Sequence, residues 1–101
     1  MKKTFLRHIE AEIEQQKRQL AQRTLQELSE LPSRTDVQKE FEGQNYILTT
    51  WRDDLENGQV AIGIFADIPG VFGSTAIHDG FLVRQDGTRS PMPMDMQVKH
   101  I

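Results

Sequence analysis

The sequence predicts an α+β fold, in which a long N-terminal helix packs on a curved antiparallel meander of four to five strands. Three observations predict it: no Gly or Pro interrupts the chain before Pro32, apolar runs flank Asn57-Gly58, and turn residues punctuate the rest. We expect the 101 residues to form one domain, with the helix over residues 1–31, the sheet over 37–90 and an extended tail over 91–101.

The predicted helix covers residues 3–31, which are rich in Ala, Leu, Glu, Gln, Lys and Arg. Its apolar side chains fall on one stripe that would face the core. A helix of this length would measure about 43 Å, whereas a chain of this size has a radius of gyration of only about 13 Å. We therefore expect either a bend at Glu14–Gln19, which lacks apolar residues, or an end that projects beyond the sheet.

The predicted sheet begins with a short strand, Val37–Phe41, although Thr35 could instead open a helical turn. Asn57-Gly58 then predicts a type I′ hairpin between the strands Gln44–Asp53 and Gln59–Asp67.

The second half of the sheet contains a predicted loop, Asp67–Ser74, with a type II turn at Pro69-Gly70. A strand over Thr75–Arg84 follows, in which Asp79-Gly80 is either a turn or a bulge. A turn at residues 85–87 leads to a last short strand, Thr88–Ser90.

Both faces of this sheet carry large apolar side chains, because alternation places Ile47 and Trp51 on one face and Tyr46 and Leu48 on the other. One helix covers one face only, so the second face predicts a partner chain, and hence a homodimer or another protein partner. The candidate interface residues lie on the first helix turns, on this strand and at the apolar loop tip: Phe5, Leu6, Ile9, Tyr46, Leu48, Val71 and Phe72.

No stretch of the sequence has a recognisable catalytic or metal-binding motif. His78-Asp79 is the most site-like dipeptide, but neighbouring strand residues point to opposite faces. The chain has no cysteine, and its three histidines lack the spacing of metal ligands. We therefore expect no catalytic residue, no metal and no cofactor. The sequence favours a protein that is not an enzyme. Candidates for lining a pocket between helix and sheet are the following: Trp51, Arg52, Asp53, Phe65, His78, Asp79 and Phe81.

Composition excludes further classes. The net charge is −3 and the cations form no stripe, which disfavours nucleic-acid binding. No window approaches the roughly 20 apolar residues of a membrane span. The basic start MKKTFL lacks the apolar segment of a signal peptide, so we expect a cytoplasmic protein that binds no membrane.

The leading hypothesis is a non-enzymatic assembly or protein-interaction module that acts as a homodimer. The alternative is a small-molecule-binding protein or minor enzyme, with its pocket between the helix and the curved sheet. The order of elements resembles the helix-then-sheet plan of cystatin-like and cone-shaped folds, an analogy of architecture that implies no activity.

Overall fold

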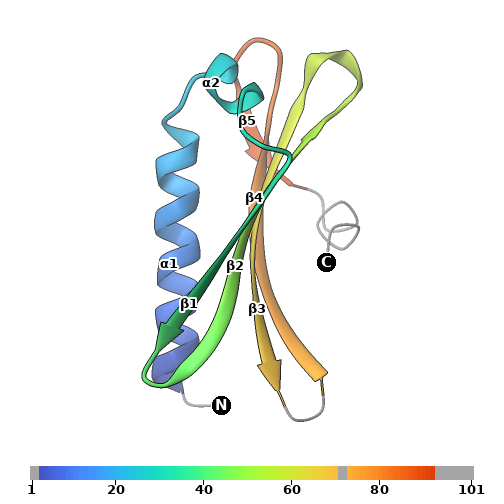
Figure 1. Ribbon diagram of the computed structural model, residues 1–101. Coiled ribbons are helices and arrows are strands. Elements are labelled where there is room, and N and C mark those ends of the chain that lie inside the picture. Colours follow the sequence, from blue (N-terminus) through green and yellow to red (C-terminus); the bar gives the residue numbers. More distant parts are fainter. Residues whose placement is uncertain (1–2, 71–72, 93–101) are drawn as a thin grey trace.

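In the computed structural model, helices lie on one face of a five-stranded antiparallel sheet (Figure 1). The strands follow one another across the sheet in chain order, which confirms the predicted α+β meander. The structure describes residues 3–70 and 73–92, so the predicted tail lies almost wholly outside the described residues. The elements are α1 (Lys3–Ala21), α2 (Leu25–Ser29), β1 (Arg34–Phe41), β2 (Gln44–Asp54), the 3-10 turn η1 (Glu56–Gly58), β3 (Val60–Gly70), β4 (Gly73–Val83) and β5 (Arg89–Pro91).

The single helix predicted over residues 3–31 is in fact two helices. α1 ends at Ala21, and Thr24 caps α2. The Thr24 hydroxyl accepts a hydrogen bond from the Glu27 N–H, and the Glu27 carboxylate accepts one from the Thr24 N–H, each at 3.1 Å. This reciprocal capping box satisfies main-chain donors that a continuous helix would have used otherwise. The chain therefore turns after α1, not at the predicted Glu14–Gln19 bend.

A two-residue hairpin turn joins β1 to β2. Glu42 and Gly43 both have positive φ, at 51° and 80°, as a type I′ turn requires. Asn57-Gly58 does lie between β2 and β3 as predicted, but within a longer loop that contains η1 and is closed by the Leu55 N–H donating to the Gln59 carbonyl at 2.8 Å. The type I′ turn predicted for Asn57-Gly58 is therefore wrong.

The hairpin of β3 and β4 is longer than predicted, because residues 67–70 and 73–74 of the predicted loop Asp67–Ser74 continue the strands. Pro69 pairs with Ser74, and Gly70 with Gly73. β2 pairs with β3 only as far as Asp67, so the missing N–H of Pro69 lies along an open stretch of β3. The expected type II turn at Pro69-Gly70 does not form, because both residues belong to β3.

Neither the turn nor the bulge predicted at Asp79-Gly80 forms, because β4 continues through both residues. Gly80 lies directly opposite Gly63 on β3. A Cβ on Gly80 would stand 2.5 Å from the Ile62 carbonyl oxygen and 2.9 Å from Met92 Cε. Glycine is thus required here for close packing rather than for a turn. The predicted turn at residues 85–87 is confirmed, and there the Arg84 N–H donates to the Thr88 carbonyl at 2.8 Å.

The main core lies between the helices and one face of the sheet. Val60, Ile62 and Ile64 face it, as their shared parity predicts. A smaller cluster occupies the opposite face and contains Trp51, Ala61, Phe65 and Met92, with Leu55 and Leu82 packed against it. Both faces of the sheet are therefore apolar, as predicted, and both clusters are buried within the described chain.

Candidate functional site

The seven residues predicted to line a pocket do not converge, because the sheet divides them. Phe81 belongs to the core under the helices, and Asp79 on the same face reaches Lys17 of α1. Trp51 and Phe65 belong to the opposite cluster. Asp53 pairs with Ala61 and His78 with Phe65, so both share that opposite face. His78 and Asp79 thus diverge, as strand alternation predicts.

Asp79 serves to hold α1 on β4. The Lys17 ammonium lies 2.7 Å from the Asp79 carboxylate and 3.3 Å from that of Glu14. The hydrogen bond to Asp79 raises the pKa of Lys17 above its ordinary 10.5, and Glu14 adds to the effect. Asp79 also accepts a hydrogen bond from the Gly80 N–H at 2.7 Å. These contacts account for the carboxylate without a ligand.

Arg52 connects β2 to the last residue of α2 and to the segment that follows it. Its guanidinium donates to the Ser29 carbonyl and lies 3.6 Å from the Asp54 carboxylate, while its main-chain N–H donates to the Ser33 carbonyl at 2.9 Å. Its Nε is buried without a partner among the described residues. Arg52 is thus used to anchor the chain between helix and sheet.

Most of the predicted interface side chains are used inside the chain itself. Phe5, Ile9, Tyr46 and Leu48 are buried in the main core, and Leu6 packs against it. Val71 and Phe72 lie outside the described residues. The four buried side chains are therefore not on the surface of the single chain, where they could contact a partner.

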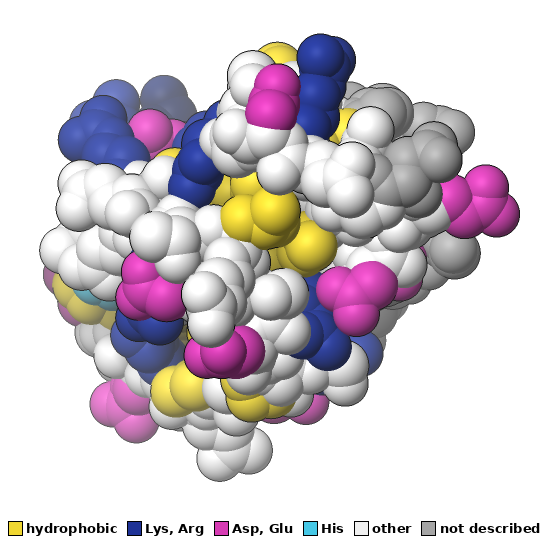
Figure 2. Space-filling view, turned by 90° about the horizontal axis from the view of Figure 1, so that it is seen from above, with side chains coloured by type: hydrophobic (Ala, Val, Ile, Leu, Met, Phe, Trp, Pro, Cys, Tyr) yellow, Lys and Arg dark blue, Asp and Glu magenta, His cyan; other side chains and the backbone are white. Residues whose placement is uncertain are grey.

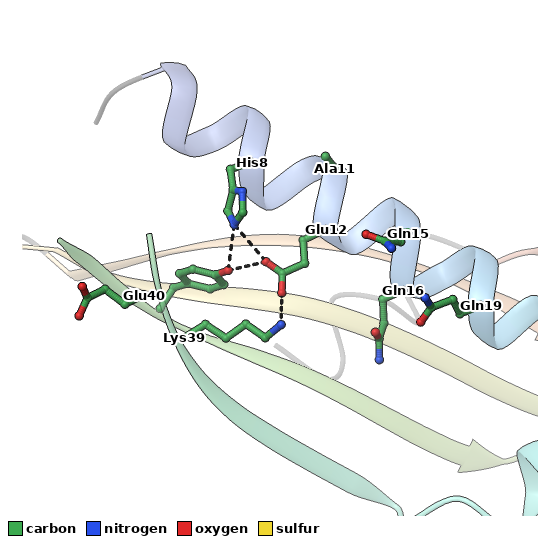
Figure 3. Close-up of a pocket in the computed structure, with 9 residues that line it drawn as sticks. His8, Ala11, Glu12, Gln15, Gln16, Gln19, Lys39 and Glu40 are labelled. Atoms are coloured by element: carbon green, nitrogen blue, oxygen red, sulfur yellow. Dashed lines mark hydrogen bonds and ion pairs between the residues drawn. The ribbon is translucent and has the colours of Figure 1, made fainter. Parts of the chain in front are cut away.

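An open groove of about 620 Å³ lies between α1 and the sheet. Figure 3 shows its polar lining, with Glu12 at the centre. Lys39 and the Tyr46 hydroxyl both donate to the Glu12 carboxylate, and His8 Nε2 lies 3.4 Å from it. Gln15, Gln16 and Gln19 extend the lining along α1.

The groove carries two groups with shifted pKa values. Burial alone would raise the pKa of Glu12, but the hydrogen bonds from Lys39 and Tyr46, with the positive charge of Lys39, outweigh it and lower that pKa. Burial, followed by the hydrogen bond to Glu12, raises the pKa of Tyr46 well above its ordinary value of 10.0. At neutral pH the Glu12 side chain is therefore a carboxylate that accepts hydrogen bonds from two donors, Lys39 and Tyr46.

β1 is the exposed edge of the sheet. Its first seven residues are exposed, and only Phe41 at its end is half-buried, where the His8 ring stacks on it with centroids 3.9 Å apart. β1 pairs with β2 alone, and no described residue bonds to the main chain along its outer side. Val37, 44% exposed, is the one large apolar side chain that stands in solvent among the described residues.

The surface at the α2 end of the molecule carries a mixture of charged and apolar side chains (Figure 2). In the view onto the α2 end of the molecule, Lys and Arg alternate with Asp and Glu, and apolar side chains form small separate patches (Figure 2). Across residues 3–70 and 73–92 no three metal-ligating side chains gather, and none of the described helices is long and apolar enough to cross a membrane.

Comparison with protein-family models, with curated proteins and with solved structures found no match to this chain. The two features that stand out in the structure, the Glu12 cluster and the edge β1, were not among the sequence candidates. Strictly local patterns could not connect Glu12 with Lys39, which is 27 residues away. The one available signal was the charged composition of residues 34–40, which is typical of a sheet edge.

Proposed function

We propose that this protein is a non-enzymatic assembly module that acts as a homodimer, and that the outer edge of β1 (Arg34–Phe41) is its contact surface. The single observation that carries the proposal is the unpaired edge itself: a strand of eight residues, the first seven of them exposed, with no partner on its outer side among the described residues. Such an edge is a template for another strand.

Several features of the described chain support assembly over catalysis. The candidate polar residues are dispersed over both faces of the sheet or are paired inside the fold. The opposite edge, β5, is only three residues long, so β1 is the longer template. The absence of cysteine from the sequence fits a reducing compartment, and we place the protein in the cytoplasm.

Gln38→Pro tests this edge, with Gln38→Ala as its matched control. Residues 33 and 52 form a hydrogen-bonded pair, so the main-chain groups of residue 38 point away from β2. Proline there removes an outward N–H and leaves the bonds between β1 and β2 intact, a position that edge strands tolerate. Sedimentation velocity over a concentration series should show a dimer for the native chain and for Q38A, and a monomer for Q38P.

Circular dichroism and thermal unfolding of Q38P check that the fold is kept. A native chain that sediments as a monomer at every concentration up to about 100 μM would overturn the proposal, since that range covers even weak specific pairing. A folded Q38P variant that dimerises as well as Q38A would show that another surface makes the dimer.

The groove beside Glu12 favours a second candidate, a binder of a small polar molecule. Its volume of about 620 Å³ falls in the range of ligand sites, and its lining is polar. This candidate predicts chemical-shift changes confined to His8, Glu12 and Lys39 when a panel of small polar compounds is added to the labelled protein. Glu12→Gln should abolish those changes while the sedimentation of the protein stays the same.

A further inference from the structure

Two main-chain hydrogen bonds determine the hydrogen-bonding phase of β1, that is, which of its residues direct their N–H and C=O groups to β2 and which direct them outward. The Arg52 N–H donates to the Ser33 carbonyl at 2.9 Å, which makes residues 33 and 52 a hydrogen-bonded pair. Such pairs alternate along an antiparallel ladder, so residues 35, 37 and 39 direct their main-chain groups to β2. The Leu55–Gln59 bond gives the same phase from the other side of β2. The N–H and C=O groups of residues 34, 36, 38 and 40 therefore point outward.

A second copy of β1 can use these groups only in a few registers. Two copies related by a two-fold axis normal to the sheet run antiparallel and keep their helices on the same face, so opposed residues must share parity. An axis at Asp36 places that carboxylate opposite its own copy. An axis at Gln38 places Asp36 opposite Glu40 twice. Like charges directly opposite one another are destabilising.

We propose that a second copy of this chain pairs with β1 antiparallel, in the register centred on Val37. Arg34 of each copy then lies opposite Glu40 of the other, which gives two opposite-charge pairs. Asp36 lies opposite the Gln38 amide, an uncharged hydrogen-bond donor. Charge complementarity therefore selects this register over its two neighbours.

The same register accounts for the exposure of Val37. Val37 is 44% exposed in the single chain, and on the two-fold axis it meets its own copy at a non-hydrogen-bonded position, where opposed side chains are closest. The four outward residues of each copy form hydrogen-bonded pairs, which supply about eight main-chain hydrogen bonds between the copies. The two sheets of five strands would join into one continuous sheet.

This inference rests on the proposed function and specifies its contact. The register is tested by charge exchange between two variants. Arg34→Glu alone places Glu opposite Glu twice, and Glu40→Arg alone places Arg opposite Arg twice, so each homodimer should weaken about tenfold or more. A mixture of the two variants restores both Arg–Glu pairs, and native mass spectrometry should show mainly heterodimer.

Arg34 also donates to Asp36 at 3.0 Å and lies 5.7 Å from the centre of the Phe65 ring, so R34E changes contacts within its own chain. Recovery of the dimer on mixing cannot come from those internal contacts, and it therefore reports on the pairing alone. Mixing that yields no heterodimer above a random distribution would overturn the register.

Single-cysteine variants give an independent test, because the native sequence has no cysteine. In the proposed register, Val37→Cys faces its copy with the Cα atoms about 4.5 Å apart, a separation that a disulfide accepts. Thr35→Cys and Lys39→Cys lie on the same face of β1 but not opposite their own copies. Mild oxidation should link V37C within minutes and leave both controls largely monomeric on a non-reducing gel.

The two proposals fail in distinguishable ways. If Q38P abolishes the dimer while T35C or K39C cross-links faster than V37C, the edge is the contact surface but the register is wrong. If a strand from another protein is the natural occupant, the chain alone stays monomeric and V37C does not cross-link, which overturns the homodimer itself.

Discussion

Replacing Gly63 by alanine should destabilise the protein, although alanine is ordinarily favoured over glycine within a strand. The Trp51 indole lies against Gly63, its neighbour in the pairing of β2 with β3. A Cβ at residue 63 would stand 2.0 Å from Trp51 Cε2 and 2.2 Å from Cζ2. Carbon atoms pack at about 3.5–4.0 Å, so the ring would have to shift by about 1.5 Å or leave its place.

The free energy of unfolding that G63A loses has a lower and an upper bound. Overpacking a well-packed site costs about 1–3 kcal/mol, and the replacement of a strand glycine returns about 0.5–1 kcal/mol. Loss of the Trp51 contacts, if the ring were expelled, would approach the 3–5 kcal/mol of a Trp→Ala change. Trp51 is only 5% exposed, so its ring cannot move into solvent to avoid the added methyl group without losing most of its packing. We expect G63A to lose about 2 kcal/mol, or roughly 10 °C in Tm.

Urea and thermal unfolding followed by far-UV circular dichroism measure this loss in every variant, and in G63A the fluorescence of Trp51, the only tryptophan, reports on the ring itself. All variants should be compared at one protein concentration, since dimerisation would add to apparent stability. In a Trp51→Ala background the obstacle is absent, and Gly63→Ala should then cost less than about 0.5 kcal/mol. An equal cost in both backgrounds, or an unchanged native emission spectrum in G63A, would refute the proposed contact between ring and glycine.

Two further predictions concern α1 and α2. Glu12→Gln should be destabilising at neutral pH. Because the pKa of Glu12 is lowered from its ordinary 4.5, the contribution of the carboxylate is present above that pH and is lost as the pH falls through the folded-state pKa, so the difference from the native free energy of unfolding should shrink in acid. The exposed Glu10→Gln is the control, and a difference that persists unchanged at low pH would contradict the assignment. Thr24→Ala should cost about 1 kcal/mol in thermal unfolding through loss of the α2 cap, whereas Thr24→Ser, which keeps the oxygen, should cost much less; equal losses in the two would exclude the capping role.

The fold was predictable to the level of its elements because hydrophobic periodicity is a local property of the chain. The alternation of Val60, Ile62 and Ile64 identified the face that packs under α1. Turn types were less predictable, since the register of the paired strands decides how many residues are left to connect them. Asp54 pairs with Val60, so residues 55–59 must form the loop, and Asn57-Gly58 cannot form a two-residue turn.

The helix boundary was present in the sequence but was outweighed by composition. Thr24 and Glu27 have the spacing of a capping box, yet they lie in a stretch whose helix formers also predict continuity. The contacts of the candidate site residues were harder still to predict from the sequence. Lys17 meets Asp79 only because α1 crosses β4, and that crossing depends on the packing of the whole core.

The burial of the side chains changes where on the sheet we expect a partner to bind. Large apolar side chains on both faces of the sheet predicted that a second chain covers the face opposite the helix, yet Trp51 and Phe65 on that face are already 5% and 6% exposed. These two side chains therefore leave little of their own apolar surface to drive association there. The unsatisfied groups are instead the main-chain donors and acceptors along the outer side of β1, whose hydrogen bonds another strand can complete. Assembly by this chain is therefore expected to extend the sheet at its edge, with Val37 at the contact, and to leave the face of Trp51 unchanged.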